Sequence, residues 1–167
     1  HKEYRRQRQM CIRDSRSNSL PVMVFPYFVH LYYIRSWSSI TTDGIPTLVR
    51  AELTDYGTAP KIVANPLMEG VENMSFQYGI DSSEPADNQI DYYTPAPTTL
   101  TEWARVRTVK VYLLVRGINK AQISIPDRAY DMGDSVPVVP APEDRDYRHH
   151  WFTTVIRLDN TLNRTLQ

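Results

Sequence analysis

The sequence predicts an α+β fold that is mainly antiparallel β-sheet, with about five strands and one or two short helices. Two observations favour this class. The 167 residues contain 11 Tyr and 12 Pro against only 6 Gly, a composition typical of strands joined by Pro-containing loops rather than of a helical bundle. Several segments also alternate apolar and polar residues with a period of two, which is the pattern of a half-buried strand.

The first half of the chain is expected to form three strands and a short helix. Residues 29–35 are aromatic and β-branched, and residues 47–53 alternate in polarity. Pro66 suits the first turn of a helix, where its missing N–H would be unpaired anyway, so we predict a short helix over residues 67–71. Residues 74–80 then alternate as a half-buried strand.

The second half is expected to add two strands, a second short helix and two long loops. Residues 106–116 alternate over the longest stretch in the chain, and residues 150–158 form the last strand. The second helix is predicted over residues 100–104. Polar and Pro-containing sequence places loops at residues 81–99 and 117–148.

The strand alternation also predicts a core. With 41% hydrophobic residues the chain has enough apolar side chains to bury one, and its length is that of about one domain. Alternation places a set of apolar side chains on repeated faces of one sheet. We therefore predict that seven residues are largely buried: Phe76, Tyr78, Val109, Val111, Leu113, Phe152 and Ile156.

Charge and cysteine content exclude several classes of protein. Lys plus Arg and Asp plus Glu both number 19, so the net charge is zero, whereas a dedicated nucleic-acid binder carries a basic excess. A single cysteine, Cys11, excludes an internal disulfide framework and a Cys-rich zinc site. No run of residues approaches the roughly 18 apolar residues that a membrane-spanning helix needs.

The N-terminal residues 1–16 differ in composition from the rest. They lack apolar periodicity and are strongly basic, with Lys2, Arg5, Arg6, Arg8, Arg13 and Arg16 against Glu3 and Asp14. Such a segment could contact phosphate or anionic lipid, or could be a disordered terminus. Residues 10–15 also resemble translated sequencing-adaptor sequence. We therefore divide the chain into a non-native or disordered head, residues 1–16, and a globular domain, residues 17–167.

The densest group of metal-ligand types lies in residues 143–150. Four side chains there could bind a divalent metal: Asp144, Asp146, His149 and His150. The spacing is poor, because neighbouring histidines on a strand face opposite sides of the sheet. Two arginines in the segment would also neutralise the carboxylates. The segment is expected to be a solvated loop that enters a strand, without a metal.

Other candidate groups also have structural explanations. Residues 81–91 carry carboxylates that could bind calcium, but they lack the Gly and the terminal Glu of an EF-hand loop. His30 is expected to be a satisfied sheet histidine, and Cys11 lies in the head. The tyrosines could stack on sugars, but most alternate with aliphatic residues as in strand packing. No catalytic, cofactor-binding or metal-binding residue is predicted, and no enzyme is expected.

Four segments, in order along the chain, resemble a known family, the PilW-type minor pilins. Residues 66–81 (PLMEGVENMSFQYGID) are similar to the family segment LVEGVENMQFxYGID. Residues 103–116 resemble its W…V…VRVxLLVR strand, and residues 151–160 resemble the closing RRxFTTTVxLRN strand. Upstream, residues 32–34 and 45–50 fit the strand pair YYI…PxLxR.

The resemblance covers roughly residues 28–160, with departures. His149 and His150 stand where the family usually has a basic pair, and Asp159 replaces a basic residue. The family's N-terminal apolar helix and cleavage signature are also not in this sequence. The resemblance therefore implies the periplasmic, pilin-like globular head of a longer protein.

The function implied by the resemblance is structural. Such a head would prime or cap a type IV pilus together with other minor pilins and the pilus assembly machinery, with the two long loops as sites of partner contact. The location would be the periplasm and inner membrane, reached through the missing helix, and then the pilus on the cell surface. Two alternatives stay open: a type II secretion pseudopilin of similar fold, and a secreted carbohydrate-binding module that uses the tyrosines.

Overall fold

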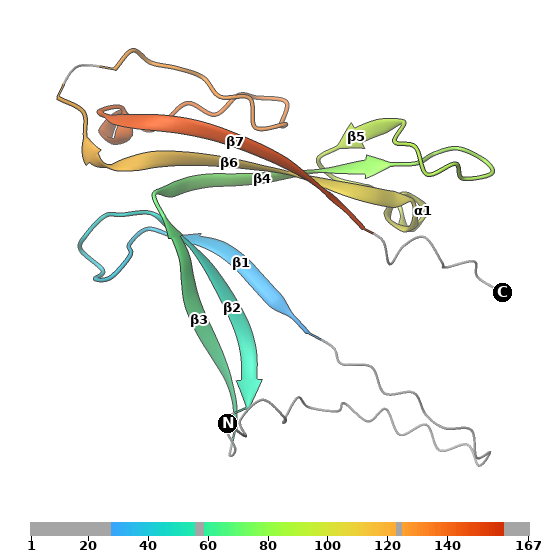
Figure 1. Cartoon of the computed structure of the whole chain (residues 1–167), viewed down its shortest axis with the longest axis horizontal. Helices are drawn as coiled ribbons and strands as arrows, with labels where there is room; N and C mark the ends of the chain where they lie inside the picture. Colours follow the sequence, from blue (N-terminus) through green and yellow to red (C-terminus); the bar gives the residue numbers. More distant parts are fainter. Residues whose placement is uncertain (1–27, 56–58, 123–124, 159–167) are drawn as a thin grey trace.

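The computed structural model describes residues 28–55, 59–122 and 125–158, and within them seven strands form two antiparallel sheets (Figure 1). The first sheet has the strand order β1-β2-β3, with β1 at His30–Arg35, β2 at Thr47–Asp55 and β3 at Pro60–Glu69. The second sheet has the order β5-β4-β6-β7, with β4 at Val71–Ile80, β5 at Tyr92–Thr94, β6 at Val106–Lys120 and β7 at Tyr147–Arg157. The mainly antiparallel β prediction is confirmed.

The two sheets meet at Gly70, between β3 and β4, and diverge from there (Figure 1). Gly70 has a φ of 83°, a left-handed conformation that side chains with a Cβ rarely adopt. Its N–H donates to the carbonyl of Pro46 at 2.6 Å, and its own carbonyl accepts the N–H of Arg116 at 2.8 Å. A Cβ at this position would collide with the backbone oxygen of Arg116. The junction therefore needs glycine for both its conformation and its close packing.

Helix is scarce in the described residues. The α-helix α1, Leu100–Ala104, begins with a capping box in which Thr99 and Glu102 cap each other's backbone N–H groups. A single 3₁₀ turn, η1, covers Pro142–Asp144. The helix predicted at residues 100–104 is confirmed, but two such short elements leave the fold almost entirely β.

The expectation of about five strands and of a helix at residues 67–71 was wrong. Residues 67–69 end β3, and Val71 begins β4. Pro66 lies in β3, opposite Val49 and next to a register shift. Because β3 is an edge strand, it can accommodate a residue without an N–H. The second missed strand, β5, is a three-residue segment inside the predicted loop 81–99 and pairs with the end of β4.

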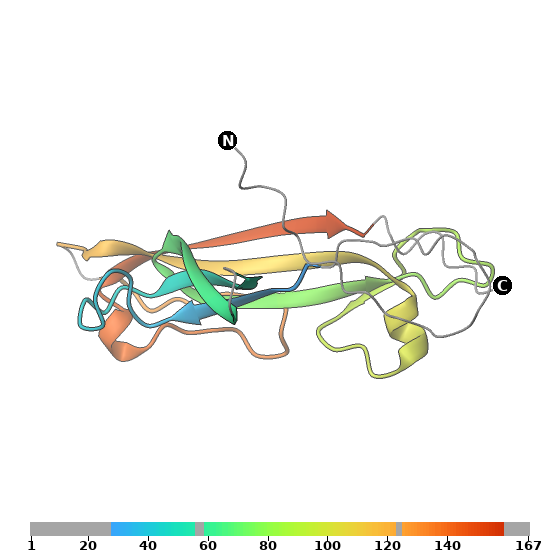
Figure 2. The ribbon, with the colours of Figure 1, turned by 90° about the horizontal axis from the view of Figure 1, so that it is seen from below.

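The main core lies on one face of the second sheet. Tyr112 and Leu114 of β6 pack there against Met132, and all three are buried. Met132 comes from the long segment between β6 and β7, which crosses this face of the sheet (Figures 1 and 2). Hydrogen bonds hold the crossing: Ser75 donates to the Met132 carbonyl, and Gln77 Nε2 donates to the Gly133 carbonyl at 2.6 Å.

The seven residues predicted as the core lie on the opposite face of this sheet. The prediction that they are largely buried was wrong. Register places Phe76, Val111 and Thr154 side by side there. Phe152 and Ile156 are 54% and 50% exposed, and the other five are half-buried. Alternation shows which residues share a face but not which face is covered. Here the β6–β7 segment covers the face of Tyr112 and Leu114 instead.

Two further expectations concern the ends of the chain. The head, residues 1–16, and its boundary with the rest lie outside the described residues. No helix in the described ranges is long and apolar enough to cross a membrane.

Candidate functional site

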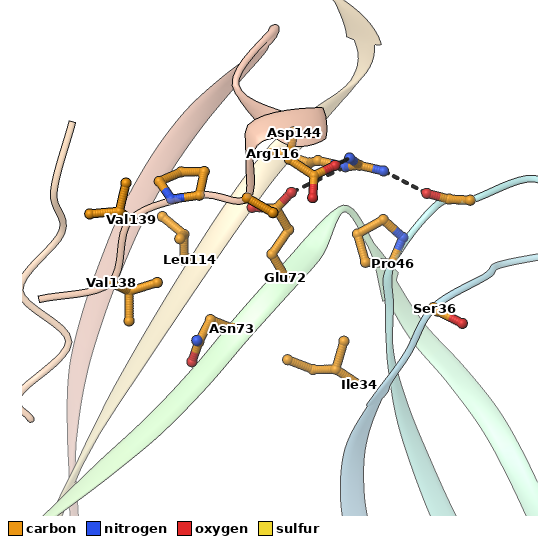
Figure 3. Close-up of a pocket in the computed structure, with 13 residues that line it drawn as sticks. Ile34, Ser36, Pro46, Glu72, Asn73, Leu114, Arg116, Val138, Val139 and Asp144 are labelled. Carbon is orange, nitrogen blue, oxygen red and sulfur yellow. Dashed lines mark hydrogen bonds and ion pairs between the residues drawn. The ribbon is translucent and has the colours of Figure 1, made fainter. Parts of the chain in front are cut away.

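A largely buried group of ionisable side chains lies where the two sheets meet η1 (Figure 3). We call Glu72, Arg116, Asp144 and His149 the Arg116 cluster. Its centre, Arg116 on β6, is only 8% exposed. It follows Tyr112 and Leu114 on the same face of the strand, because residues two apart point the same way. The alternation that buries the core therefore also carries an arginine into the interior.

Arg116 contacts four different parts of the chain. Its Nε lies 3.4 Å from Glu72 Oε1 on β4, and its guanidinium pairs with the Asp144 carboxylate in η1. Its Nη2 donates to the carbonyl of Gly44, in the loop between β1 and β2, at 2.5 Å. The guanidinium carbon also lies 4.0 Å from the ring centroid of Tyr147 on β7. One side chain thus links the first sheet, the second sheet and the segment that covers it.

Glu72 and His149 form the second pair of the cluster. His149 Nε2 lies 2.9 Å from Glu72 Oε2, and the His149 side chain is almost fully buried. The distance is that of an ion pair, although His149 Nε2 lacks the alignment of a hydrogen bond. Burial raises the pKa of Glu72 above its usual range, and the nearby His149 and Arg116 only partly oppose this effect. The pKa of Glu72 therefore depends on the charges of its neighbours in the cluster.

An open cleft of about 440 Å³ lies beside the cluster (Figure 3). Its walls are mostly apolar, with Ile34 and Pro46 on the side of the first sheet and Val138 and Val139 on the side of the β6–β7 segment. The residues that line it include no His, Cys or Lys, and its arginine is already paired. The polar side chains of the lining are Ser36, Asn73 and the charged residues Glu72, Arg116 and Asp144, and both carboxylates pair with the arginine.

The structure separates the four side chains considered as metal ligands. Asp144 pairs with Arg116, Asp146 lies 3.0 Å from Lys120 Nζ, and His149 faces Glu72. His150 is exposed on the other face of β7, near the Phe152 ring. In the part of the chain that the structure describes, no group of three or more His, Cys, Asp or Glu could hold a metal ion. The expectation of a solvated loop was wrong for Asp144 and His149, because these two side chains contact Arg116 and Glu72 in the cluster.

The acidic residues of the predicted 81–91 loop organise the loop itself. Asp81 is fully buried and accepts the N–H groups of Ser83 at 3.2 Å and Asn88 at 2.8 Å. Burial alone would raise its pKa, but these hydrogen bonds and the charge of Arg107 lower it overall. Asp91 accepts both the N–H and the hydroxyl of Ser82 at 2.7 Å. These carboxylates are used for loop structure.

The remaining candidates do not converge on one place. His30 is exposed on β1, with Nε2 3.5 Å from Glu52 Oε2. Tyr112 is buried, whereas Tyr32 on β1 and Tyr92 on β5 are exposed on different sheets. Cys11 lies outside the described residues. The tyrosines considered for sugar stacking are thus divided between the core and separate surfaces.

Sequence reasoning missed the Arg116 cluster because its members are far apart in the chain. A signal was present: Arg116 continues the face of Tyr112 and Leu114, which is unusual for a charged residue. Its partners could not be found from the sequence, since they depend on how the β1–β2 loop and η1 approach β6.

Comparison with protein families identifies a matching family model. The model of the family described as type IV pilus-assembly protein W (PilW) matches residues 31–160. This range extends from β1 to just beyond β7 and so includes both sheets and the Arg116 cluster. Comparisons with curated proteins and with solved structures gave no significant match.

Proposed function

Because the chain belongs to the type IV pilus-assembly protein W family, we propose that it is a minor pilin that primes or caps the pilus fibre through protein–protein contacts. The family match over residues 31–160 is the observation that carries this proposal. Membership of the family implies a part in type IV pilus assembly and protein partners in the pilus machinery. The more specific proposal is that these partners are other minor pilins. On this proposal the chain works in the periplasm and inner membrane and then on the pilus.

The Arg116 cluster supports a structural role of this kind. A subunit that contacts several partners needs its sheets and loops fixed relative to one another. Here one buried arginine links the two sheets with η1. Within the cluster both carboxylates pair with Arg116, and the walls of the adjacent cleft are mostly apolar. This arrangement suits a rigid body better than a reactive centre.

We place the partner contacts on the two long loops. Loop 81–99 is anchored internally by Asp81 and Asp91, while Asp87 in the same loop stays exposed. In the β6–β7 segment Met132 is anchored in the core, while Asp134 two residues on is exposed. Loops fixed at their bases on a rigid scaffold suit specific recognition. Their exposed carboxylates would tune encounter with a partner.

The test is association of the full-length protein with the other minor pilins of the same pilus system. Asp87→Lys and Asp134→Lys are expected to reduce co-purification several-fold. A matched charge reversal outside these loops, Lys61→Glu at the exposed end of β3, is expected to leave it unchanged. If the unmodified protein does not associate with any of them, the minor-pilin proposal is wrong. If all three variants behave alike, the loops are not the contact sites.

A further inference from the structure

Strand β7 leaves one long edge of the second sheet open. β7 is the last strand in the order β5-β4-β6-β7, and it pairs with β6 from Tyr147 to Arg157. It forms one margin of the sheet in Figure 2, and no strand of the described residues lies on its other side. Its 11 residues make it about twice as long as a typical strand. The backbone N–H and C=O groups on that side are therefore a template for another strand.

The composition of β7 lacks the features that usually block an exposed edge. Its sequence, YRHHWFTTVIR, contains no Lys, Asp, Glu, Pro or Gly. Formal charges occur only near its ends, at Arg148 and Arg157. Between them, Trp151, Phe152, Val155 and Ile156 are 43–54% exposed, with members on both faces of the strand. Proteins generally avoid such an edge by charges, prolines or bulges, because it binds other strands.

The other edge strands in the described structure are either blocked or shorter than β7. β3 carries Pro60, Lys61 and Pro66 along its ten residues. β5 has only three residues. β1 also lacks Lys, Asp, Glu, Pro and Gly and exposes Leu31 and Tyr32, but it has only six residues. Among the described residues, β7 therefore offers the longest edge strand without blocking residues.

Charge complementarity distinguishes a different protein from a second copy. The sequence of β7 contains no Asp or Glu, so a second copy of this strand cannot place a carboxylate opposite Arg148 in any register. Opposite charges directly across a strand pair stabilise the pairing. A strand of another protein, with an apolar centre and an acidic residue opposite Arg148, would gain an ion pair that a second copy cannot supply.

We propose that the open edge of β7 over residues 148–156 binds an extended segment of another protein by β-strand addition, the segment being apolar at its centre and acidic opposite Arg148. In this mode main-chain hydrogen bonds supply affinity, and side chains of alternate residues supply specificity. The proposal deepens the proposed function, since it rests on the chain acting by assembly with partner proteins.

The probe is the synthetic peptide Asp-Val-Thr-Val-Thr-Val-Thr-Val-Asp, which presents an acidic residue in either orientation. It is added at up to millimolar concentration to the ¹⁵N-labelled chain, and amide hydrogen exchange is followed by NMR. Exchange in residues 148–156 is expected to slow at least tenfold, with no change in β1, β2 or β3. The same peptide with Lys at both ends should bind several-fold more weakly, and the difference should shrink in high salt.

Two N-methylated peptides test whether main-chain pairing is responsible. Methylation of the amides along one edge of the peptide leaves its other edge able to pair, so binding should persist. Methylation along both edges should remove binding, although the side chains are unchanged. In the protein, Val155→Lys is expected to weaken binding at least tenfold, whereas Val136→Lys, at an exposed loop valine, should have no effect.

Four outcomes would overturn the proposal. They are no slowing of exchange in β7, equal binding of the doubly methylated peptide, equal binding of the Lys-ended peptide, and slowing that depends on protein concentration without peptide. The last would identify a second copy as the occupant. In the pilus system, unchanged association of the Val155→Lys protein would count against the edge but not against assembly. Absence of association for the unmodified protein would count against the proposed function itself.

Discussion

At the residue scale, Arg116 shows how one buried charge can hold distant segments together. Removal of one partner from a buried ion pair typically costs about 3–5 kcal/mol, because the remaining charge is left without a partner in the interior. Arg116→Met would leave both Glu72 and Asp144 without their cation. We therefore expect the free energy of unfolding to fall by about 3 kcal/mol in urea titrations.

The matched control for this variant lies on the same strand. Lys120 pairs with Asp146 at 3.0 Å, but both side chains are more than half exposed. Exposed pairs contribute only about 0–1 kcal/mol. Lys120→Met is thus expected to change stability by less than about 1 kcal/mol. Equal losses for the two variants would show that Arg116 does not act as the link between the sheets.

A second residue-scale prediction concerns Asp43, in the loop between β1 and β2. Its carboxylate accepts the N–H groups of Ser38, Ser39, Ile40 and Ile45 at 2.8–3.1 Å. These bonds, that of Ile45 foremost, hold the pKa of Asp43 well below its usual range. A carboxyl whose pKa is lowered in the folded state stabilises the fold above its ordinary pKa and loses this effect as pH falls.

The expected result is a difference between the wild-type chain and Asp43→Asn that depends on pH. At pH 7 the variant should melt at a lower temperature, because an amide oxygen accepts these N–H groups less well than a carboxylate does. The difference should begin to shrink below about pH 4, the ordinary pKa of an aspartate, as the wild type takes up a proton. Melting curves at several pH values measure it. A constant difference between pH 7 and pH 2 would contradict this account.

At the scale of the elements, the sequence was informative about strands and less so about what covers them. Clean alternation located β4, β6 and β7, and the second predicted helix, over residues 100–104, coincides with α1. Pro66 misled because proline suits both a helix start and an edge strand, and only the sheet order decides between them. β5 has just three residues, too few for any periodicity. The covered face depends on a loop whose path is fixed by Met132 and by hydrogen bonds to its backbone, so local pattern could not predict it.

Two adjacent leucines of β6 test which face is the core. Leu114 is 1% exposed beneath the β6–β7 segment, whereas Leu113 points to the opposite, half-open face. An unpaired carboxylate is costly only where water is excluded. Leu114→Asp is expected to destabilise the chain by about 4 kcal/mol or more, and Leu113→Asp by clearly less. The readout is urea denaturation of both variants. If Leu113→Asp were more destabilising than Leu114→Asp, the core would lie on the face that alternation alone predicts.

At the scale of the whole molecule, the relation between the two sheets depends on the junction at Gly70 and on the arginine that crosses it. The family match could be anticipated from the sequence, because its motifs lie in the strands that build both sheets. The Arg116 cluster and the open edge of β7 could not, since each exists only once the strand order is known. The proposed role in pilus assembly uses both features, one to keep the subunit rigid and the other to extend its sheet.

Gly70 gives the last prediction, with Gly44 as its control. Both glycines have positive φ, 83° and 61°, so alanine is strained at either position. At Gly44 a Cβ would meet nothing within 4 Å, and strain alone costs about 1–2 kcal/mol. At Gly70 the added Cβ would also collide with the backbone oxygen of Arg116, which cannot move without disturbing the cluster. Gly70→Ala should therefore lose clearly more stability than Gly44→Ala in chemical denaturation. It should also speed amide exchange on both sides of the junction, in residues 46–49 and 114–116, because the hydrogen bonds of Gly70 to Pro46 and Arg116 would be strained together. Equal effects of the two substitutions would mean that the sheets are not held at this junction.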